Sequence, residues 1–275
     1  MTGPPRAARR WIGRAALGTV VVAGYAVIVA PLVFVSWLAF FRNEVASFPP
    51  EGYSLRWFAN ILDQKNFVDG FLTSLEIALV AMVNGLVVGV PAALALARHR
   101  LVGREAAATL LLLPLVVPGV VAGAAIYVFH VEVEVATGIR RVAALPGLVL
   151  AHVMITIPWT VRLIAANLSG LDRSVEEAAM NLGAGPVLTF RRIMLPMIPP
   201  GIVAAALFSF IVSFGNLEMT LFLVGPGRIT LPIAILQYLE WRIDPTIAAV
   251  SFRQIVLVGA GMILTDRCGK LANVF

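Results

Sequence analysis

The sequence predicts an all-α, polytopic membrane protein with six transmembrane helices. Of its 275 residues 60% are hydrophobic and only 13% are charged, and the mean hydropathy is +0.92. Soluble domains carry roughly 25% charged residues and about 45–50% apolar ones, so a chain this apolar needs lipid around it. Its apolar residues gather in charge-free runs of about 20 residues, the length that a helix needs to cross the hydrocarbon core. Long continuous runs of this kind fit helices rather than the strands of a barrel.

Six spans are expected in a single transmembrane domain covering residues 1–275, since no internal repeat or low-complexity linker divides the chain. The first run follows four arginines and holds 27 residues without a charge. A cleaved signal has an apolar core of roughly 7–15 residues, so we expect this first span to be retained. Arg253 interrupts the sixth run. The spans are expected at about 15–41, 70–97, 106–129, 142–166, 196–224 and 245–265.

The distribution of charge predicts the orientation of these spans. With the N-terminus inside, 13 of the 21 Lys and Arg residues and five of the 15 acidic residues fall on one side. Lys and Arg collect on the cytoplasmic side of membrane proteins, so both termini are expected in the cytoplasm. This bias also accounts for the net charge of +6 without nucleic acid as a partner. The basic residues on this side are Arg6, Arg9, Arg10, Arg14, Arg98, Arg100, Arg104, Arg162, Arg173, Arg191, Arg192, Arg267 and Lys270.

The segment Arg42–Asp69 is expected on the opposite side. Its apolar residues Leu55, Phe58 and Leu62 recur at helical spacing, which predicts a short amphipathic helix at the membrane interface. The Gly225–Asp244 segment is expected as a loop on the same side.

Several kinds of chemistry are excluded by what the sequence lacks. A single cysteine, Cys268, excludes a disulfide framework within the chain. His, Cys and carboxylate residues do not occur at metal-site spacing, and the three histidines form no pattern with a nucleophile. A Gly-x-x-x-x-Gly-Lys-Ser/Thr phosphate loop is also missing, so any ATP hydrolysis belongs to another chain. We expect no catalytic residue, no metal and no cofactor.

The longest cytoplasmic connection, at about 171–196, is the most informative stretch. Ser174 followed by Glu177 fits a capping box, which predicts a helix over 175–182. Gly183 suits the left-handed residue that ends a helix, and Gly185-Pro186 suits the start of a second one. The second helix would present an apolar stripe of Val187, Phe190, Ile193 and Met194. A helix–turn–helix knob with small residues fits docking into a partner's groove, although an ordinary amphipathic connection between spans would show the same spacing.

The same stretch resembles the EAA motif of binding-protein-dependent ABC importer permeases of the MetI-like fold. That pattern is Glu-Ala-Ala, three residues, Gly, nine residues, Ile, one residue and Leu-Pro. Every fixed position is matched here, by Glu177, Ala178, Ala179, Gly183, Ile193 and Leu195-Pro196. The resemblance extends over roughly residues 15–268.

The resemblance implies a transport subunit that does not hydrolyse ATP itself, in the bacterial inner membrane. The family's EAA segment is the coupling helix, which inserts into a cleft on an ATPase subunit. By matching position, Glu177, Ala178, Ala179 and Gly183 would make the coupling contacts. The implied partners are two ATPase subunits, a second related permease, which makes the pair a heterodimer, and a periplasmic solute-binding protein facing the Arg42–Asp69 and Gly225–Asp244 segments.

Charged residues inside spans are costly, so they are candidates for the substrate path. Glu218 and Glu76 are the candidates here, together with Asn216, which neighbours Glu218 in the sequence. Snorkelling of charged side chains, or a pair between Glu218 and Arg253, would also explain the charges. His152 is expected to bond between helices rather than bind a ligand.

The run from Ser213 to Thr220, followed by Gly225-Pro226-Gly227, resembles the second permease of spermidine/putrescine-type importers. In that subgroup an acidic residue often follows the Ser-Phe pair, whereas here Gly215-Asn216 stands there and the nearest carboxylate is Glu218. The resemblance implies a polyamine as solute, and other members of the wider group carry iron complexes, phosphonates, sulfate or amino-acid-like solutes.

Two other classes of protein are weighed against an importer permease. An ion-coupled secondary transporter predicts paired intramembrane carboxylates and an inverted repeat, and neither is visible. A membrane-embedded enzyme would need His, Asp or Glu clustered near an interface, and the sequence has no such cluster.

Overall fold

The protein is helical throughout the part of the chain that the computed structural model describes, which is residues 6–45, 47–99, 102–225 and 227–272. Within these ranges, extended pairing is limited to the isolated bridges Phe41–Tyr53 and Gly225–Arg228. The all-α prediction is therefore confirmed.

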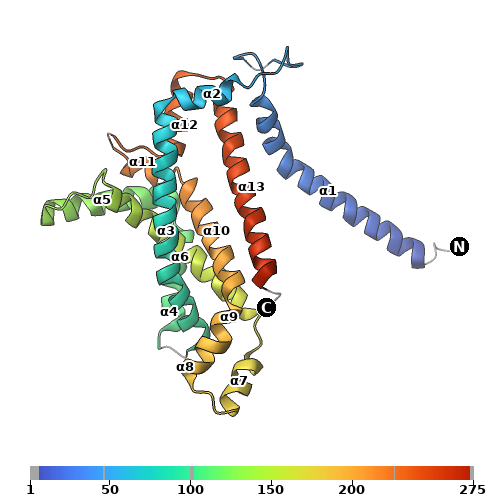
Figure 1. Ribbon diagram of the computed structural model, residues 1–275, viewed down its shortest axis with the longest axis vertical. Helices are drawn as coiled ribbons and strands as arrows, with labels where there is room; N and C mark the ends of the chain where they lie inside the picture. Colours follow the sequence, from blue (N-terminus) through green and yellow to red (C-terminus); the bar gives the residue numbers. More distant parts are fainter. Residues whose placement is uncertain (1–5, 46, 100–101, 226, 273–275) are drawn as a thin grey trace. The chain divides into compact units, whose positions relative to one another are not determined.

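The chain divides into two compact units, one of residues 1–63 and 241–256 and the other of residues 64–240 and 257–275. Helix α1 (Arg6–Leu38) and helix α2 (Arg56–Asp63) belong to the first unit. Helix α13 (Thr246–Ala272) contributes residues to both units, and α12 (Leu231–Trp241) ends at their boundary. The second unit holds the other elements (Figure 1): α3 (Lys65–Arg98), α4 (Arg104–Leu112), the 3₁₀ turn η1 (Leu113–Leu115), α5 (Gly119–Thr137), α6 (Leu145–Ser169), α7 (Arg173–Asn181), α8 (Pro186–Thr189), the π-helical turn η2 (Phe190–Met194), α9 (Leu195–Met197), α10 (Pro199–Phe214) and α11 (Thr220–Leu223).

Among the residues that the structure describes, five helical segments are long and apolar enough to cross a membrane. They are Ala16–Leu38, Lys65–Arg98, Gly119–Thr137, Leu145–Ser169 and Thr246–Thr265. A sixth span results if Pro186–Met197 and Pro199–Phe214, which meet at a bend of 59°, are counted together. The predicted number of spans agrees with this count, although two of the predicted spans are interrupted.

The span expected at 106–129 is not one helix. Helix α4 ends at Leu112, a 3₁₀ turn follows, and α5 begins at Gly119 and continues to Thr137. Pro114 and Pro118 lie at this interruption, and proline lacks the N–H that the helical ladder needs. The residue before a proline is also disfavoured in the α conformation. The charge-free run therefore predicted one continuous helix, whereas the two prolines divide it into two helices, α4 and α5.

The span expected at 196–224 is also interrupted. Helix α10 ends at Phe214, Gly215 closes its C-terminus, and the chain resumes helical structure only in the short α11. The segment expected as a loop at Gly225–Asp244 contains helix α12 instead. Apolarity alone did not reveal the break after α10, because the residues that follow Phe214 carry no charge until Glu218.

The core of the second unit is formed by three helices, α3, α6 and α10, which pack on one another (Figure 1). Gly85 and Gly89 of α3 lie against Thr156 and Thr160 of α6 so closely that an added Cβ at either glycine would come within 3 Å of a threonine side chain. Small residues four apart allow helices to approach in this way inside a membrane. The Thr160 hydroxyl in turn lies 3.1 Å from the Ser209 hydroxyl of α10, so buried hydroxyls link the helices.

The first unit confirms the short helix predicted after the first span. Trp57 and Ile61 of α2 are buried, and the Trp57 indole N–H donates to the Phe41 carbonyl at 2.6 Å. Of the three apolar residues that predicted the helix, Phe58 is half-buried against the rings of Phe40 and Phe252, whereas Leu55 and Leu62 are exposed. An exposed apolar face fits a helix at the membrane interface, which stays a prediction.

The packing of α3 on α6 yields a direct test. Val in place of Gly89 must displace Thr160, and overpacking of this kind costs about 1–3 kcal/mol. Gly259→Val in α13 is the matched control, because an added Cβ there meets nothing within 4 Å. In thermal unfolding of the purified protein in detergent, Gly89→Val is expected to lower Tm clearly and Gly259→Val to leave it nearly unchanged. Equal Tm values for the two variants would contradict the close packing.

Candidate functional site

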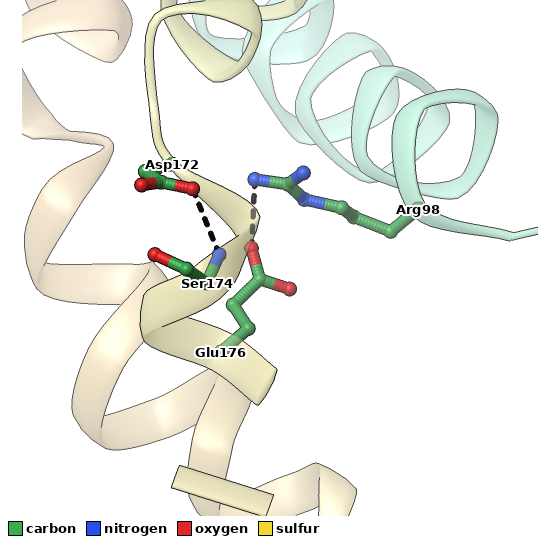
Figure 2. Close-up of polar contacts among 4 residues, drawn as sticks. All are labelled: Arg98, Asp172, Ser174 and Glu176. Carbon is green, nitrogen blue, oxygen red and sulfur yellow. Dashed lines mark hydrogen bonds and ion pairs between the residues drawn. The ribbon is translucent and has the colours of Figure 1, made fainter. Parts of the chain in front are cut away.

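The segment predicted as a coupling knob begins with an N-cap different from the one expected. Helix α7 starts at Arg173, and the Asp172 side chain accepts a hydrogen bond from the Ser174 backbone N–H at 2.9 Å (Figure 2). The capping box of Ser174 and Glu177 is therefore wrong. Asp caps helices as well as Ser does, and Asp172 has the extended backbone that an N-cap requires. Hydrogen bonds from Ser174, chiefly from its backbone N–H, hold the pKa of Asp172 below its usual range, so this cap stays ionised.

The other end of α7 is closed by the glycine that the sequence predicted. Gly183 has a φ of +88°, which glycine adopts without strain. Its N–H donates to the Met180 carbonyl, and the Ala184 N–H donates to the Ala179 carbonyl, both at 3.0 Å. These two bonds form a Schellman motif, which satisfies carbonyls at the helix end. The nine-residue helix is thus closed at both termini by its own sequence.

The second short helix begins at Pro186, as expected, but its apolar stripe is not continuous. Val187 is 79% exposed whereas Met194 is 8% exposed. The turn from Phe190 to Met194 is π-helical, and an i→i+5 turn shifts every later side chain around the axis. The 3.6-residue period that predicted one stripe of Val187, Phe190, Ile193 and Met194 does not hold through such a turn.

The four predicted coupling residues lie together on one short, accessible segment. Glu177, Ala178 and Gly183 are exposed, and Ala179 is half-buried. Next to them is a groove of about 600 Å³ between α7, the Pro186–Met194 segment and the end of α3. Its lining residues are Leu94, Arg98, His99, Glu176, Glu177, Met180, Pro186, Val187, Thr189, Phe190 and Met194.

An ion pair joins α7 to the end of α3. Arg98 Nη2 lies 2.7 Å from Glu176 Oε1, and the two side chains are only 13% and 16% exposed (Figure 2). Arg98 is the last residue of α3, and Glu176 lies in the first turn of α7. The residues are 78 positions apart in sequence, and no local spacing pattern would have paired them.

The second candidate region is the interruption between α10 and α11. His152 of α6 is 1% exposed, with Nδ1 2.8 Å from the Ser213 hydroxyl and Nε2 3.2 Å from the Thr220 hydroxyl. These contacts bridge the two ends of the interruption. The expectation that His152 bonds between helices agrees with this geometry.

Asn216 is part of the same local structure. Its side-chain oxygen accepts from the Met219 backbone N–H at 3.0 Å, and its backbone carbonyl accepts from the Thr220 hydroxyl at 2.6 Å. The Asn216 carboxamide oxygen is therefore engaged in shaping the turn. A role for this residue in the substrate path would have to use its remaining N–H donors.

Glu218 is exposed at the tip of this turn, which lies on α5. The Glu218 carboxylate rests against Gly119 so closely that any Cβ there would collide with it, and a Cβ at Gly123 would come 2.9 Å from the Met219 Cα. Gly119 and Gly123 thus form a flat surface at the start of α5 that receives the chain at Glu218–Met219. No ion pair engages the Glu218 carboxylate within the described residues.

Glu76 does not join this group. It lies on α3, half-exposed, 3.8 Å from Arg228 Nη1. Exposed pairs at this distance contribute roughly 0–1 kcal/mol. Arg253 is exposed and belongs to the other unit, so its pair with Glu218 stays a prediction. Among the described residues, no three His, Cys, Asp or Glu side chains come together as metal ligands.

Comparison with known proteins identifies the family. The family profile described as "Binding-protein-dependent transport system inner membrane component" matches residues 85–271. The putrescine transport system permease protein PotI of Escherichia coli K12 is 31% identical over 233 residues, which cover 84% of this chain and 83% of PotI. The spermidine/putrescine transport system permease protein PotC of Haemophilus influenzae is 27% identical over 223 residues, which cover 81% and 84% of the two chains.

A solved structure supports the same fold. The crystal structure of a bacterial alginate ABC transporter, in complex with an alginate pentasaccharide-bound periplasmic protein, contains a chain that superposes with a TM-score of 0.71 at 16% identity, over 94% of both chains. The profile match covers more than half of the sequence, and the fold, the spans and the relatives agree with it. This chain belongs to the family of binding-protein-dependent transport system inner membrane components, the permease subunits of ABC importers.

Proposed function

We propose that this permease carries a polyamine and that α7, with Glu177, Ala178, Ala179 and Gly183, is the segment through which a separate ATPase drives it. Two ATPase subunits, a second homologous permease and a periplasmic solute-binding protein are the proposed partners. The observation that carries the coupling role is the short α7 helix, closed at both ends and accessible over its Glu177–Gly183 surface.

The geometry of α7 suits the transmission of force. Its N-terminus is capped by Asp172 and its C-terminus by the Gly183 turn, so the helix does not need a partner to form. Glu177 and Ala178 face away from the protein's own core, which leaves them for another chain. A rigid segment pushed by a partner moves as a body, which is how small shifts at an interface become larger transitions.

The proposed orientation places both termini and α7 in the cytoplasm. The contact between Arg98 and Glu176 puts the end of α3 and the start of α7 on the same side. That side is the one where Lys and Arg predominate, which is the cytoplasmic side in membrane proteins. Across a single transmembrane domain, the Arg42–Asp69 segment and the segment around α12 then face the periplasm and the binding protein.

A polyamine is the proposed solute because PotI and PotC, by their names, carry putrescine and spermidine. Polyamines are cations at neutral pH, so their path benefits from carboxylates without an internal partner. Glu218 is such a carboxylate, held at a turn that His152 and Asn216 fix in place. Glu76 is a second acidic candidate, half-exposed beside Arg228.

The coupling role predicts a loss of uptake without a loss of protein. Glu177→Lys reverses a charge on the exposed surface of α7, and Gly183→Asp forces a left-handed residue to carry a side chain. Both variants are expected to abolish uptake while the protein remains in the membrane at normal levels. Uptake of labelled solute and immunoblots of membranes give the two readouts. Normal ATPase coupling in these variants would refute the coupling role.

The solute is tested with cells that depend on this permease. Labelled putrescine or spermidine is expected to accumulate only when the transporter is intact, and excess unlabelled polyamine should compete. Phosphonates, iron complexes and amino acids are offered as competitors in parallel. Competition by one of these, with none by polyamines, would replace the proposed solute while leaving the transporter class in place.

The Glu218 carboxylate is expected to contribute to cation passage. A bond to a charged group contributes about 1.5–3 kcal/mol, so Glu218→Gln should reduce polyamine uptake by roughly tenfold or more. Glu132→Gln makes the same change on an exposed carboxylate of α5 and serves as the control. Equal uptake rates for Glu218→Gln, Glu132→Gln and the unaltered protein would remove Glu218 from the path.

A further inference from the structure

We infer that Arg98 is a positioning residue that ties the start of α7 to the end of α3, so that motion of the coupling segment reaches a core helix directly. The inference rests on the coupling role proposed for α7. It concerns a contact inside this chain rather than the surface offered to the ATPase.

The pair joins two helix ends of opposite polarity. Arg98 occupies the last turn of α3, where the backbone carbonyls carry partial negative charge, and Glu176 occupies the first turn of α7, where the N–H groups carry partial positive charge. Each side chain is thus favoured where it stands, and the ion pair at 2.7 Å connects the two termini.

Burial raises the cost of breaking this contact. With only 13% and 16% of the side chains exposed, the pair is poorly screened by solvent, and removing one partner leaves the other charge largely buried. Arg98 Nε and Nη2 are both buried without a hydrogen-bond partner, so Nη2 contacts Glu176 as an ion pair rather than through an aligned hydrogen bond. For packing alone, an apolar side chain would avoid that desolvation, so the guanidinium is explained by its contact with Glu176.

The position of the pair makes it a link between the site and the core. Helix α7 packs mainly on α8 and η2, which belong to its own connection, whereas α3 packs extensively on α6 and α10. Glu176 therefore reaches past its local neighbours to one of the three core helices. Glu177, the next residue, is exposed, so adjacent carboxylates on α7 serve an internal and an external contact.

The test reverses the charge of each partner singly and then exchanges the two charges in a double variant. Arg98→Glu and Glu176→Arg each place like charges together, and the double variant restores opposite charges. The swapped charges oppose both helix dipoles, so recovery to about half of the original value is expected rather than full recovery. Arg98→Lys keeps the charge and should behave nearly as the original. Glu132→Arg, a charge reversal on an exposed carboxylate of α5, is the matched control.

Two readouts separate positioning from general damage. The first is the distance distribution between spin labels at Val87 and Asn181, introduced as cysteines in a Cys268→Ser background, in the full-length permease in lipid nanodiscs. The second is solute transported per ATP hydrolysed in the assembled transporter. Coupling between sites typically amounts to about 5–150-fold, and each single reversal is expected to lower the transport ratio by about tenfold and to broaden the distance distribution.

The outcomes are distinguishable. Recovery of both readouts in the double variant, with Glu132→Arg unchanged, supports the inference. Any one of three results overturns it. These are an unaltered distance distribution in the single variants, failure of the double variant to recover, and a transport ratio that the single reversals leave unchanged. If Glu177→Lys and Gly183→Asp also leave uptake intact, the coupling role itself fails, while the label distances still report on the contact of Arg98 with Glu176.

Discussion

The close approach of α3 and α6 is the constraint on which both candidate regions depend. Gly85 and Gly89 leave no room for side chains opposite Thr156 and Thr160, so the two helices are fixed against each other at backbone distance. Helix α6 ends at Ser169, and α7 starts at Arg173. Only because α3 and α6 are fixed in this way does the end of α3 lie where Arg98 reaches Glu176.

Helix α6 also holds the interruption after α10, through His152. From His152 to Ser169 are 17 residues, which is roughly 26 Å along a helix. One helix therefore anchors the turn that carries Glu218 near one end and leads into α7 at the other. A rigid displacement of α6 would reach both regions without any rearrangement within the helix.

Much of this arrangement could be predicted from the sequence, because apolar runs, charge bias and helix-ending residues act locally. The helical class, the number of spans, the Gly183 terminus and the Pro186 start all follow from such local signals. The interruptions at 113–118 and 215–219 were missed because an uninterrupted apolar run does not reveal where proline or glycine ends a helix. Asp172 was missed because Ser174 offered an equally plausible cap two residues later. The contacts of His152 and Arg98 join residues 61 to 78 positions apart, and no local pattern encodes such pairs.

Adjacent residues on α7 differ in what they can contribute. Successive helical side chains point about 100° apart, so Glu176 turns toward α3 while Glu177 turns outward. The charge of Glu176 is matched within the chain, and a partner gains little by approaching it. Glu177 has no ion-pair partner among the described residues, so its charge is available to another protein. In the coupling role proposed for α7, Glu177 would receive the force from a separate ATPase and Glu176 would pass it to the spanning helices, so a single turn of α7 would provide both contacts.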